Sequence, residues 1–153
     1  MELDKQEYEL TTKLLDNAYK NVRMATFAID CIIDKIKDGR LEELLRKQND
    51  FYLDTTEELE KLSEELKHTP ADINIFLKGS SFASIKMKAM MNDETQHLAE
   101  MLTQGTTMGI TEMIKSLSDY PSKNEKLVKI CKQITGSEEK FVESLKDFLW
   151  KIS

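Results

Sequence analysis

The chain contains two histidines, and each follows a glutamate by three residues, in Glu65-Leu-Lys-His68 and in Glu94-Thr-Gln-His97. On a helix, residues three apart lie on the same side, so each pair could present one oxygen and one nitrogen to a metal ion. Iron, manganese and zinc accept this combination of carboxylate and imidazole ligands. Glu65, His68, Glu94 and His97 are therefore the candidate metal ligands of this sequence.

Both pairs also fit ordinary roles at the ends of helices. The chain carries 28 acidic residues, so a glutamate three residues before a histidine arises easily by chance. His68 near the end of one predicted helix and Glu94 in the first turn of another would each interact favourably with a helix dipole. Because spacing alone does not show that ligands converge, capping and surface roles are the favoured interpretation and a metal site is the alternative.

Other residue types offer less chemistry. Met87, Met90 and Met91 have the spacing of a soft copper(I) site, but methionines more often fill gaps or form adaptable docking surfaces. Cys31 and Cys131 have isoleucine neighbours, and buried thiols are usually inert. We therefore predict no catalytic residue.

Composition favours a helical, soluble protein, since 40% of residues are hydrophobic and 33% charged, with only 5 Gly and 2 Pro. The net charge of −6 argues against binding to nucleic acid or anionic lipid. The sequence has no run of 18 apolar residues that could span a membrane. The polar N-terminus and two widely separated cysteines predict a reduced, cytoplasmic location.

Apolar residues recur at three- and four-residue steps in four segments, which predicts four helices in a single domain over residues 1–153. The expected helices cover about residues 4–37, 41–67, 94–119 and 123–151, and Gly39 is expected to end the first of them. Residues 68–92 form a connector, broken by Pro70, with a short helix over about residues 80–91.

Two helical hairpins predict an all-α, antiparallel four-helix bundle. An up-down-up-down order of helix directions is favoured, because a short helix shortens the reach of the connector. This order would place Cys31 and Cys131 at the same level of the bundle. A connector that crosses the bundle would produce an up-down-down-up order instead.

The third predicted helix carries two glycines, Gly105 and Gly109, on its apolar face. It is expected to begin after Asp93 as the capping residue and to stop at Pro121. Each glycine costs a helix close to ~1 kcal/mol relative to alanine. The pair therefore predicts that another helix packs very close to this face.

The helix lengths, the crossover, the ExxH pairs and the stretch HLAEMLTQGTTMGI (residues 97–110) resemble the ferritin-like superfamily, in particular small bacterial members. That resemblance implies a four-helix bundle in which active members direct a lone glutamate from helices one and three, and ExxH from helices two and four, toward the centre. The fourth helix of this chain has no histidine, and the second offers Gln48 and Thr55 instead. We therefore predict a centre lined with hydrocarbon and carry over no ferroxidase, oxygenase or catalase activity.

These observations predict a non-enzymatic helical protein that acts through self-association as a homodimer or through a protein partner. The alternative is a metal-binding protein or metal-dependent oxidoreductase that holds iron or manganese with the two ExxH pairs. A third hypothesis is a small apolar ligand held in the bundle core.

Overall fold

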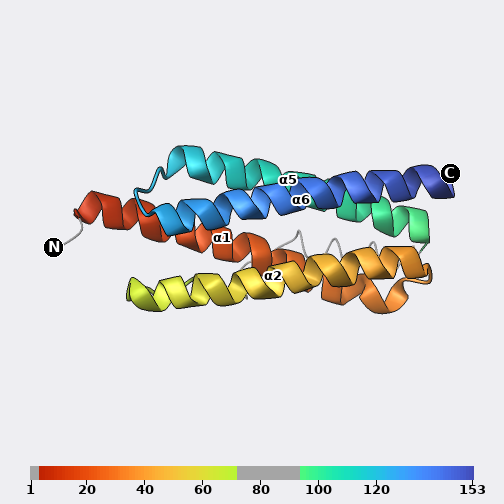
Figure 1. Ribbon diagram of the computed structural model, residues 1–153, viewed down its shortest axis with the longest axis horizontal. Helices are drawn as coiled ribbons and strands as arrows, with labels where there is room; N and C mark the ends of the chain where they lie inside the picture. Colours follow the sequence, from red (N-terminus) through yellow and green to blue (C-terminus); the bar gives the residue numbers. More distant parts are fainter. Residues whose placement is uncertain (1–3, 72–93) are drawn as a thin grey trace.

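The computed structural model describes residues 4–71 and 94–153 of the chain. Within these residues it contains four long helices and no β-strand (Figure 1). The helices are α1 (Lys5–Ile32), α2 (Gly39–Glu65), α5 (Thr95–Asp119) and α6 (Glu125–Ile152), and a short 3-10 turn, η1 (Ile33–Lys35), follows α1. The predicted all-α fold with four long helices is therefore confirmed. The expected connector helix, the copper(I) methionines and the Asp93 cap lie outside the described residues.

Side-chain caps explain where three of the helices begin. Asp4, Asp38 and Asn124 each accept a hydrogen bond from a backbone N–H in the first turn of the helix that follows. These bonds satisfy N–H groups that have no partner inside the helix. The prediction that Gly39 ends the first helix is wrong, because α1 stops at Ile32 and Gly39 is the first residue of α2.

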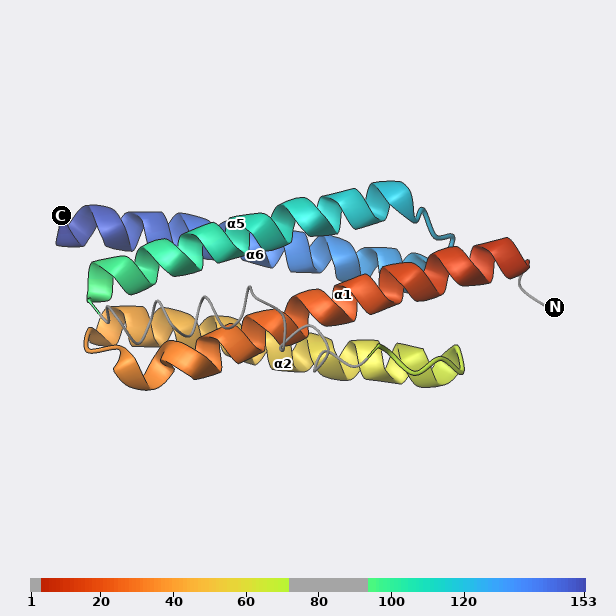
Figure 2. The same cartoon turned by 180° about the vertical axis from the view of Figure 1, so that it is seen from behind.

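Contacts between helices establish the direction in which each one runs. The informative pairs are Tyr8 with Leu66, Asn17 with Ser116, Asn21 with Gly109, Tyr52 with Glu138, and Glu65 with Lys126. Between α1 and α5 and between α2 and α6, residue numbers rise along one helix and fall along its partner, so each of these pairs is antiparallel. The short segment of residues 33–38 joins α1 to α2, and Tyr8 at the start of α1 contacts Leu66 directly after α2, so these two helices are antiparallel as well. It follows that α2 and α5 run in the same direction (Figures 1 and 2).

The favoured up-down-up-down order is therefore wrong, and the order is up-down-down-up. The end of α2 and the start of α5 lie at opposite ends of the molecule (Figure 2). A chain of the length of residues 72–93 spans about 70 Å when fully extended, whereas a helix as long as α2 or α5 spans about 40 Å. The segment is therefore long enough to join the end of α2 to the start of α5 at the other end of the molecule. Accordingly, Cys31 lies near the end of α1 and Cys131 near the start of the parallel α6, and the two do not form a disulfide.

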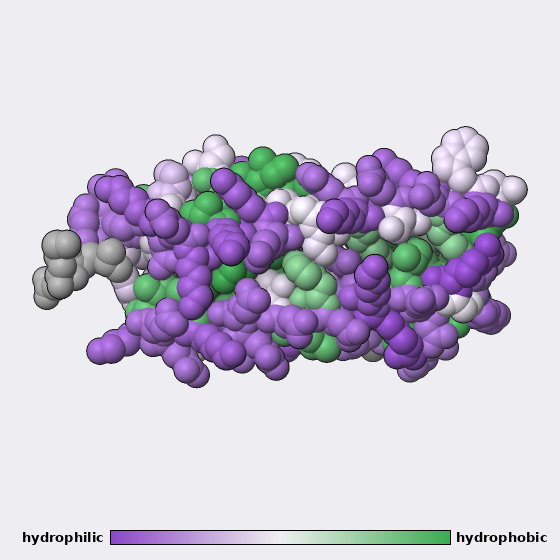
Figure 3. Space-filling model, in the orientation of Figure 1, coloured by the Kyte–Doolittle hydropathy of each residue, from purple (hydrophilic) through white to green (hydrophobic). Residues whose placement is uncertain are grey.

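The predicted apolar stripes form one core between the four helices. Each of α1, α2, α5 and α6 contributes leucines with no exposed surface: Leu14, Leu15, Leu41, Leu45, Leu59, Leu98, Leu127 and Leu145. Burying a side chain of this size stabilises the fold by roughly 1.5–3 kcal/mol. Figure 3 shows hydrophilic residues over most of the outer face, with hydrophobic residues visible in the seams between helices.

Candidate functional site

The first predicted ligand pair lies at the end of α2, where each side chain has a different partner. His68 Nε2 lies 2.9 Å from Asp16 Oδ1 of α1, and the same oxygen accepts a hydrogen bond from the Ala71 backbone N–H at 3.2 Å. Glu65 Oε1 lies 3.3 Å from Lys126 Nζ of α6. These contacts join the end of α2 to its two neighbouring helices.

The second pair lies at the start of α5. Glu94 directly precedes the first turn, and its side chain makes no capping hydrogen bond. His97 is half-buried, and its Nε2 has no hydrogen-bond partner among the described residues. Because α2 and α5 run in the same direction, this pair and the pair on α2 lie at opposite ends of the molecule. The structure therefore does not bring the four predicted metal ligands together. Among residues 4–71 and 94–153, no three His, Cys, Asp or Glu side chains are grouped so that they could hold a metal ion.

The structure instead gathers polar groups halfway along the bundle, one from each helix. We call Asn21 of α1, Tyr52 of α2, Gly109 of α5 and Glu138 of α6 the Glu138 cluster. Glu138 Oε2 accepts a hydrogen bond from the Tyr52 hydroxyl at 3.0 Å, and Asn21 Nδ2 donates to the Gly109 carbonyl at 3.0 Å. The side chains of Glu138 and Tyr52 belong to residues that are only 2% and 1% exposed. A carboxyl and a phenol are thus held in the interior by residues from separate helices.

Gly109 makes room for this carboxyl. A Cβ atom built on Gly109 would lie 3.2 Å from Glu138 Oε2 and 3.3 Å from Asn21 Nδ2, which is tighter than ordinary van der Waals contact. The prediction of a close neighbouring helix is therefore confirmed at Gly109. At Gly105 no described residue lies within 4 Å of the corresponding Cβ position, so there the close approach stays a prediction.

Burial changes the acid–base chemistry of the cluster. Removal from water disfavours the charged carboxylate and raises the pKa of Glu138 from 4.5 to about 7, although hydrogen bonds from Tyr52 and Asn21 act in the opposite direction. The pKa of Tyr52 is raised well above 10, first by burial and then by the negative charge of Glu138. Near neutral pH, Glu138 therefore exchanges a proton while Tyr52 remains a hydrogen-bond donor.

Two hydrogen-bond acceptor atoms of the Glu138 cluster accept no hydrogen bond from the described residues. Glu138 Oε1 and Asn21 Oδ1 are both buried, and neither has a hydrogen-bond partner among residues 4–71 and 94–153. A buried polar atom without a partner costs roughly 1–3 kcal/mol, and such atoms are uncommon in folded proteins. These atoms are therefore suited to a group that donates hydrogen bonds.

Glu138 and Asn21 also line a groove of about 490 Å³ between α1 and α5. Small-molecule sites usually have volumes of about 300–1,000 Å³, are mostly apolar and contain a few polar groups. The groove fits this description, since four of its lining residues are methionines: Met24, Met101, Met108 and Met113. Gly105 contributes an open stretch of backbone to the same groove.

The sequence analysis missed Glu138, although a signal was present. Glu138 follows Ile134 by four residues and precedes Phe141 by three, so it occupies a position on the buried stripe of α6. The prediction of a centre lined only with hydrocarbon is therefore wrong at this level of the bundle. Gln48, predicted on the inner face of the second helix, is indeed buried, and its Nε2 donates to Ser137 Oγ at 3.3 Å.

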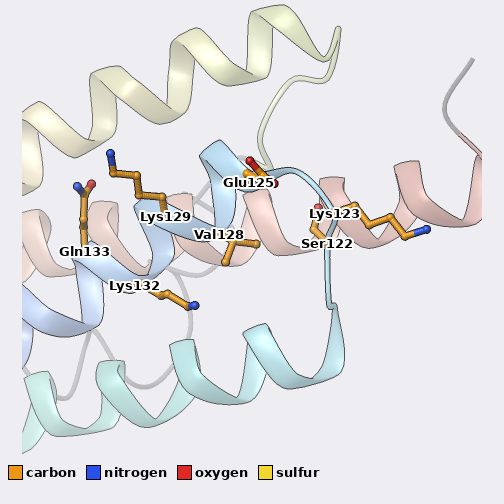
Figure 4. A pocket seen from close by; sticks show the side chains of 7 residues that line it. All are labelled: Ser122, Lys123, Glu125, Val128, Lys129, Lys132 and Gln133. Carbon is orange, nitrogen blue, oxygen red and sulfur yellow. The ribbon is translucent and has the colours of Figure 1, made fainter. Parts of the chain in front are cut away.

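A second depression lies on the surface at the start of α6 (Figure 4). Its lysines, Lys123, Lys129 and Lys132, point in different directions and do not converge on one point. The groove next to Glu138 is the better candidate site, because its polar atoms are buried and close to one another.

Comparison with protein-family models, with curated proteins and with solved structures finds no match for this chain. In the part of the chain that the structure describes, no helix has an apolar stretch long enough to cross a membrane.

Proposed function

We propose that this protein is a non-enzymatic binding protein that holds a small, mostly apolar molecule in the groove between α1 and α5. The observation that supports this proposal is the Glu138 carboxyl, which is buried at an apolar groove with Oε1 lacking a partner. A ligand that donates a hydrogen bond would remove the cost of this unsatisfied acceptor. The methionine side chains can repack around ligands of different shapes because they are unbranched and flexible.

The chemistry of the cluster favours binding over catalysis. Its side chains supply one carboxyl, one phenol and one amide, and Tyr52 is kept protonated by its raised pKa. The phenol therefore serves as a hydrogen-bond donor, and Glu138 has no nucleophile among its hydrogen-bonding partners Tyr52 and Asn21. This set can recognise a polar group more readily than it can break a covalent bond.

Membership of the ferritin-like superfamily stays a proposal. The up-down-down-up order supports it, because this is the order that a crossing connector produces in ferritin. Self-association or a protein partner also stays a prediction. Among the described residues, the large exposed apolar side chains that would support it are Leu53 on α2, Met108 and Ile114 on α5, and Trp150 on α6.

The groove can be filled by one substitution. Gly105→Leu adds a side chain to the groove, and the open space around its Cβ position allows the helix to form. Gly136→Leu is the matched control, because Gly136 also has nothing within 4 Å of its Cβ position but does not line the groove. Both changes should favour helix by up to about 1 kcal/mol.

The measurement is a titration with the fluorescent apolar probe Nile red, with circular dichroism to verify folding. We expect saturable binding to the wild type and to Gly136→Leu, and binding to Gly105→Leu that is weaker by about tenfold or more, equivalent to about 1.4 kcal/mol. Equal binding to all three proteins would show that the groove is not the site and would overturn the proposal.

A further inference from the structure

We propose that the molecule held in the groove is an amphipathic amine, whose ammonium group binds Glu138 and Asn21 while its apolar part lies between α1 and α5. This inference rests on the proposed function and adds the chemical class of the ligand.

The hydrogen-bonding atoms of the Glu138 cluster favour a ligand that donates hydrogen bonds. The Tyr52 hydroxyl already donates to Glu138 Oε2, and Asn21 Nδ2 donates to the Gly109 carbonyl. The two atoms left without partners, Glu138 Oε1 and Asn21 Oδ1, are both acceptors. An ammonium group has three donors and no acceptor, so it can satisfy both atoms. A carboxylate or phosphate would instead place its own acceptors against them.

The charges around Glu138 favour a cationic ligand over a neutral ligand that donates hydrogen bonds. The titratable groups around Glu138 come from three helices: Tyr52 from α2 faces the carboxyl directly, and Lys20 of α1 and Glu112 of α5 line the groove. Tyr52 is neutral, and the charges of Lys20 and Glu112 have opposite signs, so among the described lining residues the ionised Glu138 gives the groove a net negative charge. Attraction between this carboxylate and a cation is stronger in the interior than in water.

The ammonium group competes with a proton for the same carboxyl. Because the pKa of Glu138 is about 7 when the groove is empty, the carboxyl is about one-tenth ionised at pH 6 and nine-tenths at pH 8. An alkylamine stays protonated over this range, since amines of this kind titrate near pH 10. Amine affinity should therefore rise about tenfold from pH 6 to pH 8, with release of a proton from Glu138 on binding.

The test compares n-octylamine with n-octanol, which has the same chain length but carries no charge. Each is used to displace Nile red at pH 6 and pH 8 from the wild type, from Glu138→Gln and from Glu139→Gln. Glu139 is the matched control, because it is the exposed neighbour of Glu138. At pH 8, the wild type and Glu139→Gln should prefer octylamine by about tenfold, and Glu138→Gln should bind the two molecules equally.

The outcomes separate the two proposals. Equal binding of amine and alcohol to the wild type, or an amine affinity that does not change between pH 6 and pH 8, would overturn the ammonium assignment while the groove remained a ligand site. If neither molecule displaces Nile red, the ammonium assignment is overturned, and the groove is overturned as well only if Nile red binds equally to the wild type, Gly105→Leu and Gly136→Leu. The pH comparison uses only the wild-type protein, so it decides the question even if Glu138→Gln fails to fold.

Discussion

Replacing Glu138 by glutamine should make the folded protein more stable at pH 8 and leave its stability nearly unchanged at pH 4.5. Glutamine has almost the same shape and keeps an oxygen for the Tyr52 hydroxyl, but it cannot ionise. Its amide N–H₂ also offers a donor to the cluster, in which Asn21 Oδ1 has no partner. The substitution therefore removes the cost of burying a charge without leaving a large cavity.

The magnitude follows from the pKa of the carboxyl. Its pKa rises from 4.5 in an ordinary environment to about 7 in the fold, and each unit corresponds to about 1.4 kcal/mol. Between these two values the folded protein binds more protons than the unfolded chain, so stability falls as pH rises. The cost is absent below pH 4.5 and reaches about 3 kcal/mol above pH 7. Because Glu138 is only 2% exposed, little of this cost is screened by solvent.

Urea denaturation followed by circular dichroism, from pH 4.5 to pH 8.5, measures this effect. The difference in unfolding free energy between Glu138→Gln and the wild type should grow from near zero to about 3 kcal/mol with a midpoint between the two pKa values. Glu139→Gln should follow the wild type at every pH, since this residue is exposed. Parallel pH profiles for Glu138→Gln and the wild type would refute the assignment of a raised pKa to Glu138.

Two further predictions test the local structure around the glycines of α5 and around Cys131. Gly105→Ala should stabilise the protein by up to about 1 kcal/mol in urea denaturation, whereas Gly109→Ala should gain less or lose stability, because its Cβ would lie 3.2 Å from Glu138 Oε2; an equal gain at both positions would contradict the close packing at Gly109. Cys131 is fully buried, and burial raises the pKa of its thiol to about 12, so iodoacetamide at pH 8 should label it only as fast as the protein unfolds. Rapid labelling of the Cys131 peptide in native protein, detected by mass spectrometry, would show that this thiol is accessible.

The expected effects of Glu138→Gln on stability and on ligand binding have opposite signs. The substitution should stabilise the empty protein at pH 8 and abolish the preference for an amine. A buried group that lowers stability and improves binding is a common feature of functional sites. Both the stability of the empty protein and the displacement of Nile red can therefore be measured on Glu138→Gln and on its control Glu139→Gln.

Much of the architecture was already contained in the sequence. Periodic apolar residues predict four helices, because a stripe along one side of a helix depends only on residues three and four apart. The position of Gln48 on the inner face of its helix follows in the same way. The close approach at Gly109 was predicted from the cost of a glycine inside a helix, but the same argument applied to Gly105, where no described residue lies near the Cβ position, so the sequence could not tell the two glycines apart.

Only the tertiary structure decided the order of helix directions and the location of the polar cluster. The order depends on where the chain between α2 and α5 leads, and local periodicity contains no information about that path. The raised pKa of Glu138 depends on its removal from water and on hydrogen-bonding partners from other helices. These partners lie far away in the sequence, and Asn21 is 117 positions from Glu138. The two ExxH pairs have the local spacing of metal ligands, but they lie at opposite ends of the molecule because α2 and α5 are parallel. The Glu138 cluster has no common spacing in the sequence, and its four residues meet only because the four helices pack together.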